Sequence, residues 1–199
     1  IDMNDEQSKL YEAVRATMQD SIKQIIAQQG FKRSQIQILD ALLKLRQVCC
    51  HPSLLNLDSL PKGKNTVKSK AMRSAKLDYL IETVTDMVAE GRKVLIFSQF
   101  TSMLALIEQR LQSENIGFSK LTGKTKKRSE AIEAFQSGQV PVFLISLKAG
   151  GVGLNLTTAD TVIHYDPWWN PAAEDQASDR AWRIGQDKPV FVYKLITNQ

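Results

Sequence analysis

Compact apolar runs in the second half of the chain limit most strongly what it can fold into. They are KVLIFS (93–98), FSKLT (118–122), VPVFLIS (140–146), TVIHYD (161–166) and VFVYKLI (190–196). Each is short enough for a buried strand, and helical patterns precede them or lie between them, among them residues 75–90, 129–136 and 171–184. Apolar strands that alternate with helices are typical of a parallel sheet covered on both faces. The sequence therefore predicts an α/β fold with helices on both faces of a parallel sheet.

Residues 1–60 carry a different pattern. Apolar side chains recur there at spacings of three and four, and Gly30 interrupts them once, which predicts two helices. Residues 61–72 contain proline, glycine, asparagine and many lysines, as loops and linkers do. We therefore expect a helical subdomain over 1–60, a basic linker over 61–72 and the α/β domain over 73–199.

Composition narrows the class of protein. The chain has 199 residues and 43% hydrophobic content, and it has no apolar run near the roughly 20 residues that span a bilayer. Its polar, acidic beginning is not a signal peptide. Cys49 and Cys50 are adjacent, with only His51 beside them, so we expect reduced thiols rather than a zinc site. We expect an intracellular protein without a metal site, in the cytoplasm or nucleoid of a bacterium or the nucleus of a eukaryote.

Basic residues gather in one stretch, KLTGKTKKR (120–128). It holds five basic and no acidic residues in a chain of net charge +5, which favours a loop that contacts phosphates, although a solvated face would look the same. Its Gly-Lys-Thr is not a P-loop, because that motif needs a glycine where Phe118 stands, and the expected strand 118–122 takes the place of the loop. Lys124 and Thr125 remain candidates for contacting phosphates of another kind.

The stretch NPAAEDQASDRAWRIGQ (170–186) predicts a helix that carries chemistry. Asn170 is a favourable N-cap, and Gly185 is a favourable end. Gln176, Arg180 and Arg183 follow at i, i+4 and i+7, so one helical face presents an amide and two guanidinium groups. Guanidinium groups clamp phosphate oxygens and stabilise the charge that develops in γ-phosphoryl transfer. The simpler alternative is a local ion pair between Asp179 and Arg183.

Two further stretches follow predicted strands. SLKAGGVGLNL (146–156) places a glycine-rich turn after a strand, where the backbone can approach a ligand closely, although an ordinary turn has the same composition. DPWWNP (166–171) holds two adjacent tryptophans, which either pack under a loop or contact nucleic acid.

Taken in order, VLIFSQF, LTGKT, LISLKAGGVGLNLTTADTVIHYDPWWNP and QASDRAWRIGQ resemble the second RecA-like lobe of the Swi/Snf family. This family of ATP-dependent double-stranded-DNA translocases belongs to the superfamily 2 helicases. LRQVCCHPSLL (45–55) resembles the segment before that lobe, and the ordered set is far more specific than any single motif.

The resemblance implies a role for individual positions. It implies that Arg180 and Arg183 are arginine fingers that reach ATP phosphates, with Gln176 near the nucleotide. It places Gly151, Gly153 and Asp179 in the nucleotide cleft. The positions that would face the DNA backbone are Ser98, Gln99, Lys124, Thr125, Ser146 and Lys148, and Trp169 would lie at the groove. The sequence departs from the family pattern at Trp182, where histidine is frequent, at Lys148, where arginine is common, and at Pro167 and Trp168, which replace more polar residues.

The resemblance also implies partners and cofactors. Double-stranded DNA is the expected partner, and ATP and Mg²⁺ would be held mainly by a first ATPase lobe of the same polypeptide, which this chain lacks. DNA-bound complexes such as RNA polymerase or nucleosomes would be the target, and the chain alone would hydrolyse ATP negligibly. The alternatives are a non-catalytic nucleic-acid-binding module, an RNA helicase lobe, and a partner-docking platform formed by the helices of 1–60.

Overall fold

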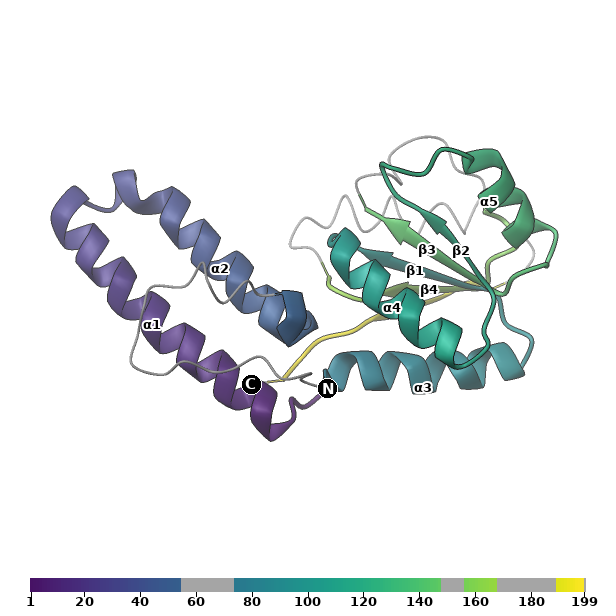
Figure 1. The fold of residues 1–199 in the computed structure, drawn as a ribbon, viewed down its shortest axis with the longest axis horizontal. Helices are drawn as coiled ribbons and strands as arrows, with labels where there is room; N and C mark the ends of the chain where they lie inside the picture. The colour runs from purple at the N-terminus through teal and green to yellow at the C-terminus, as the bar shows by residue number, and fades with distance from the viewer. Residues whose placement is uncertain (55–73, 148–155, 168–188, 199) are drawn as a thin grey trace. The chain divides into compact units, whose positions relative to one another are not determined.

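The computed structural model describes residues 1–54, 74–147, 156–167 and 189–198 (Figure 1). The chain divides into two compact units, Ile1–Asp78 with Thr197–Gln199, and Tyr79–Ile196.

The second unit is built on a parallel sheet of five strands (Figure 1). The strands are β1 (Val94–Ser98), β2 (Phe118–Leu121), β3 (Val142–Ser146), β4 (Thr161–His164) and β5 (Phe191–Lys194). Their order is β2-β3-β1-β4-β5, and every neighbouring pair is parallel. Every residue of β1, β3 and β4 is buried, as strands covered on both faces require. The predicted α/β fold with a parallel sheet is confirmed, and each predicted strand is present.

Helices cover both faces of this sheet. They include α4 (Thr101–Ser113), which contacts β1 and β3, and α5 (Arg128–Gln136), which contacts β2. Neighbouring residues of β2 show that the two helices lie on opposite faces, because side chains alternate along a strand. Ser119 Oγ donates a hydrogen bond to the Ala131 carbonyl of α5 at 2.7 Å, and Lys120 Nζ contacts Glu108 of α4 at 2.7 Å.

The apolar core follows from this layering. On the α5 face, Leu95, Phe97, Phe143 and Ile145 pack with Phe135, whose ring meets Phe143 edge to face at 5.5 Å. On α4, the fully buried side chains are Met103, Leu104, Ile107 and Leu111, which recur at helical spacing. The predicted helix over 171–184 lies outside the described residues.

A glycine follows the end of α3 (Ala75–Ala89). Gly91 has φ 81°, a left-handed conformation that favours glycine. Its N–H donates to Val88 O, and the Arg92 N–H donates to Met87 O, each at 3.0 Å. These paired bonds form a Schellman cap, which satisfies the last carbonyls of the helix and turns the chain into β1.

The first unit is a pair of helices, α1 (Asp5–Gln29) and α2 (Gln35–Cys50). Asn4 caps α1, accepting a 2.8 Å hydrogen bond from the Gln7 N–H, and Gly30 ends it at φ 80°. The helices pack through a shared cluster that includes Leu10, Val14, Met18, Ala41 and Val48. The two predicted helices and the break at Gly30 are confirmed.

Part of the apolar stripe on α2 does not enter that cluster. Ile36 is 79% exposed and Leu39 is 54% exposed, and Phe31 before the helix is 63% exposed. Helical periodicity predicted an apolar face here but did not predict what covers it. This exposure is what the docking alternative for residues 1–60 requires.

A buried glutamine joins the ends of the helices in this unit. Gln7 is fully buried, and its Nε2 donates to Val48 O at 2.8 Å and to Cys49 O at 3.3 Å. Its Oε1 accepts from Ala75 N at 3.2 Å, the first residue of α3. The last carbonyls of a helix have no partner within it, so Gln7 satisfies groups that would otherwise be buried unpaired.

We predict that Gln7→Leu destabilises the protein by about 2 kcal/mol, because it leaves one buried carbonyl, one partly buried carbonyl and one partly buried N–H without partners. For a domain of this size that corresponds to a fall in melting temperature of about 4–8 °C, which circular dichroism would measure. The matched control is Gln24→Leu, at an exposed position of the same helix. Equal melting temperatures for the two variants would contradict the role of Gln7.

The two cysteines are free thiols. Cys50 is buried and Cys49 is partly buried. Burial raises the pKa of the Cys49 thiol, although the positive charges of Lys76 and Arg46 act in the opposite direction. A raised pKa disfavours the reactive thiolate, so Cys49 behaves as a packed side chain.

Candidate nucleic-acid interface

The carboxyl ends of the five strands meet at one edge of the sheet, where open parallel sheets bind their ligands. The register pairs Ser98 with Ser146 and Leu121 with Ile145, so Thr122 follows β2 beside the end of β3. Of the predicted site residues, five lie within the described part of the chain, namely Ser98, Gln99, Lys124, Thr125 and Ser146. All five are at this edge or in the loops that leave it.

The two serines at the edge are interior. Ser98 is 0% exposed and Ser146 is 1% exposed. The Ser98 hydroxyl accepts from Phe100 N at 3.1 Å and donates to Phe100 O at 3.4 Å, which closes the turn into α4. Its carbonyl accepts from Leu147 N at 3.1 Å. The hydroxyl of Ser98 therefore shapes the loop that leads into α4 and is not itself exposed.

A buried carboxylate ties two of the edge loops together. Asp166, which follows β4, is 4% exposed, and its Oδ1 and Oδ2 accept from the Gln99 N–H at 3.3 and 3.1 Å. Gln99 Nε2 is buried and has no hydrogen-bond partner among the described residues. The sequence analysis assigned no role to Asp166. A carboxylate directly after an apolar strand was the feature of the sequence that could have indicated one.

Residues 122–128, which we call the basic loop, comprise the connection from β2 to α5 and the first residue of that helix, Arg128. Lys124, Lys126, Lys127 and Arg128 in it are exposed. Lys127 lies 3.6 Å from Glu130, but both side chains are more than 70% exposed, so this pair contributes little. In the described part of the chain, Lys124, Lys126 and Arg128 form no ion pair. The loop presents a concentrated positive charge at the carboxyl edge.

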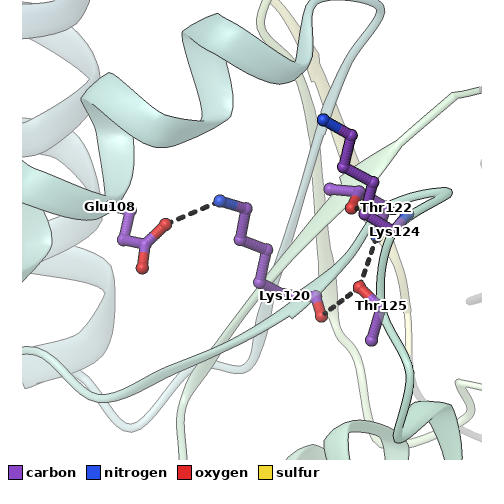
Figure 2. Close-up of polar contacts among 5 residues, drawn as sticks. All are labelled: Glu108, Lys120, Thr122, Lys124 and Thr125. Carbon is purple, nitrogen blue, oxygen red and sulfur yellow. Dashed lines mark hydrogen bonds and ion pairs between the residues drawn. The ribbon is translucent and has the colours of Figure 1, made fainter.

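Lys120, the fifth basic residue of the stretch, does not contribute to that charge. It belongs to β2, and its Nζ lies 2.7 Å from Glu108 Oε2 of α4 (Figure 2). Both side chains are about one third exposed, so water weakens the attraction between them. The pair still neutralises one positive charge and fastens β2 to α4 directly before the basic loop.

Hydroxyl groups hold the first turn of the basic loop (Figure 2). Thr125 Oγ1 accepts from Thr122 N at 2.9 Å and donates to Lys120 O at 3.4 Å. Thr122 Oγ1 accepts from Lys124 N at 3.2 Å. The Lys124 side chain extends away from the turn (Figure 2). The backbone of the turn is therefore fixed internally, and the ammonium group of Lys124 is left for solvent or a ligand.

The structure agrees with the exclusion of a P-loop. Residues 118–121, which would form most of the phosphate-binding loop, are strand β2. The Gly-Lys-Thr sequence lies in the turn just described, and Thr125 is occupied by bonds to its own backbone. The turn can contact phosphates from outside, but it does not wrap around one.

The remaining predicted site residues lie outside the described residues. These are Arg180, Arg183, Gln176, Gly151, Gly153, Asp179, Lys148 and Trp169. Their roles in the nucleotide cleft and at the DNA stay predictions.

The sequence and the fold of this chain are similar to those of known helicases and translocases. Residues 75–185 match the family described as helicase conserved C-terminal domain. YwqA of Bacillus subtilis, assigned as an ATP-dependent helicase/translocase, is 38% identical over 200 residues, which cover 99% of this chain and 21% of that protein. The chain spans about a fifth of the length of the curated relatives it matches.

Two solved structures from Sulfolobus solfataricus share the fold. The SWI2/SNF2 ATPase core in complex with dsDNA has a TM-score of 0.76 and 35% identity, over 98% of this chain and 39% of that one. The SWI2/SNF2 ATPase C-terminal domain has a TM-score of 0.72 and 35% identity, over 98% of this chain and 76% of that one. The expected RecA-like architecture is thereby confirmed. The chain belongs to the helicase conserved C-terminal domain family and is the C-terminal lobe of a Swi/Snf-type superfamily 2 helicase.

Proposed function

We propose that this chain is the half of a DNA translocase that grips the backbone of duplex DNA and supplies arginine fingers to ATP. The observation that carries the DNA part is the basic loop, with four exposed cations at the carboxyl edge of the sheet. A relative with the same fold was solved in complex with dsDNA, which supports the same partner here. Movement of this lobe against a first ATPase lobe would remodel protein–DNA complexes, such as those of RNA polymerase or nucleosomes.

The described part of the edge is suited to the backbone of DNA rather than to its bases. Lysine and arginine side chains on a surface turn neutralise phosphates and release counterions, which gives affinity without sequence information. Gln99, whose Nε2 is buried and has no partner among the described residues, would have to turn its side chain outward to donate to a phosphate oxygen. Ser98, Thr125 and Ser146 are proposed to shape this edge, and Lys148 and Trp169 to extend the contact with the duplex.

Duplex binding by the full-length protein tests this half of the proposal. Two duplexes of equal length and unrelated sequence should bind with the same affinity, and log Kd should change linearly with log salt concentration. A strong preference for one sequence that persists at high salt would contradict backbone recognition. Fluorescence anisotropy over a salt series measures both quantities.

The proposed contribution of this chain to ATP binding and hydrolysis is a set of cationic side chains and backbone groups. Arg180 and Arg183 would stabilise charge on the phosphates, and Gln176, Asp179, Gly151 and Gly153 would line the cleft. Among the described residues there is no P-loop, and none of them form a group of three potential metal ligands. The described residues therefore do not fit a complete Mg²⁺–ATP site, and we propose that a first lobe of the same polypeptide holds most of the nucleotide and its metal.

We predict that the 199-residue chain by itself hydrolyses ATP negligibly, even with Mg²⁺ and duplex DNA present, because arginine fingers act only on a nucleotide that other groups hold. A phosphate-release assay at high protein concentration measures this. Sustained turnover that survives further purification and is lost in Arg183→Ala would show that the chain holds ATP unaided.

The proposed location follows from the proposed partner. A protein that works on duplex DNA acts inside the cell, in the nucleoid of a bacterium or the nucleus of a eukaryote. Within the residues that the structure describes, no helix is long and apolar enough to cross a bilayer.

A further inference from the structure

Thr125 is bound inside its own turn. A threonine hydroxyl has one hydrogen to donate and two lone pairs that accept. Thr125 Oγ1 accepts from Thr122 N at 2.9 Å, and its hydrogen is directed to Lys120 O at 3.4 Å. A phosphate oxygen can only accept a hydrogen bond, so Thr125 could donate to one only by turning its hydroxyl hydrogen away from Lys120 O.

Thr122 binds the backbone of Lys124, which lies between the two threonines in the sequence. It is 7% exposed, and its Oγ1 accepts the Lys124 N–H at 3.2 Å. The Thr125 N–H in turn donates to Thr122 O at 3.1 Å. Both the backbone N–H of Lys124 and the hydroxyl of Thr125 are therefore used within the turn. The exposed side chain of Lys124 is not engaged by these bonds and is available to a ligand.

The base of the turn is fixed as well. The carbonyl that Thr125 contacts belongs to Lys120, whose side chain is held by Glu108 of α4 at 2.7 Å (Figure 2). The turn is thus fastened at its backbone by the two threonines and at the preceding strand by an ion pair with a helix. A cation on such a turn loses less conformational freedom on binding than one on a loose loop.

We propose that Thr125 and Thr122 are positioning residues that aim Lys124 at a phosphate of the duplex, and that Thr125 does not itself contact the DNA. This rests on the proposed function, since it assumes that the basic loop meets the DNA backbone. It replaces the sequence-based expectation of a direct contact at Thr125 with a contact made through Lys124.

A double-mutant cycle in the full-length protein tests the proposal. Lys124→Ala should reduce the magnitude of the negative slope of log Kobs against log salt by about 0.9, the value for one phosphate contact on a duplex. Thr125→Val should weaken duplex binding by about three- to tenfold, the effect of losing one ordinary hydrogen bond, and should reduce the magnitude of the slope toward that of Lys124→Ala. In the Lys124→Ala background, Thr125→Val should have no further effect, because coupled residues are not additive.

Direct contact by Thr125 predicts different results. If a neutral hydroxyl contacted the phosphate, its removal would leave the salt slope unchanged. The fold-losses in affinity of Thr125→Val and Lys124→Ala would then multiply in the double variant. Full additivity, or no effect of Thr125→Val in either background, would overturn the positioning role and leave the proposed DNA contact of the loop standing. If Lys124→Ala changes neither affinity nor slope, both the positioning role and the contact of this turn with DNA are wrong.

Matched variants separate positioning from damage to the fold. Thr125→Ser keeps the hydroxyl and should restore wild-type binding. Ser113→Ala, at the far end of α4, removes an exposed hydroxyl that also bonds to a backbone carbonyl, at 3.0 Å, and should leave DNA affinity unchanged. If Thr125→Val does not fold, Thr125→Ala replaces it in the same cycle. No further effect in the Lys124→Ala background would support the positioning role, and full additivity would overturn it.

Discussion

Arg183→Ala in the full-length protein should reduce duplex-stimulated ATP turnover by about 10³-fold or more, the range that arginine fingers contribute to phosphoryl transfer. Arg183 lies outside the described residues, and its role is proposed from its place in the QASDRAWRIGQ sequence. The guanidinium group would stabilise charge on the γ-phosphate as the two lobes close. Removing it should therefore lower kcat far more than it changes DNA affinity. Steady-state turnover at saturating duplex, with DNA affinity measured in parallel, separates the two effects.

The control for this variant is Arg33→Ala, which removes an arginine from an exposed position between α1 and α2. It should leave turnover within about twofold of wild type, as surface changes away from a site do. Turnover that stays intact in Arg183→Ala while DNA affinity falls would contradict the finger role. The arginine face of residues 171–184 would then be a clamp for DNA phosphates, as in the non-catalytic alternative.

Replacing Lys124, Lys126 and Arg128 together with alanine should weaken duplex binding by about 10²- to 10³-fold at moderate salt, and should reduce the magnitude of the negative slope of log Kobs against log salt by about 2.7. These are the cations of the basic loop that form no ion pair in the described part of the chain, and each is exposed. Lys127 is retained because it lies near Glu130. The measurement is fluorescence anisotropy at several salt concentrations.

A charge-matched control distinguishes local contact from general attraction. The triple variant Lys9→Ala, Lys23→Ala, Arg33→Ala removes the same positive charge from exposed positions of the helical unit. It should change the slope much less, because screening limits the reach of charges that do not touch the duplex. If both triple variants weaken binding equally, the basic loop is not a contact site and only net charge attracts the DNA.

The sheet could be predicted from the sequence because its signal is local. Each of the five strands corresponds to an apolar run, and Gly30 ends α1 where expected. A strand buried on both faces has to be apolar throughout, so the pattern carries the fold. The parallel arrangement then brings Ser98, Ser146 and the basic loop to one edge without further information.

The contacts that shape the site could not be predicted, because they join distant residues. Composition counted Lys120 among five available cations, yet Glu108 of α4 neutralises it. Asp166 and Gln99 are 67 residues apart in the chain, and Gln7 reaches Val48 and Ala75. Periodicity gave α2 an apolar face but no partner for Ile36. Patterns in a sequence indicate which side chains face inward, but not which of them meet.

Burial also changes what a matching position can do. The resemblance placed Ser98, Ser146 and Thr125 at the DNA by motif alone. In the structure, the two serines are interior and the Thr125 hydroxyl is bound within its turn. A motif conveys residue types in order, whereas exposure and hydrogen-bond saturation decide which of them touch a ligand.

The most direct measurement of the central claim is steady-state ATP hydrolysis by the full-length protein, titrated with duplex DNA, single-stranded DNA and duplex RNA of equal length. A DNA translocase lobe predicts strong stimulation by duplex DNA, saturating with the affinity found in binding assays, and little by RNA. Turnover that ignores duplex DNA would contradict the motor, and stimulation by RNA alone would identify the chain as an RNA helicase lobe.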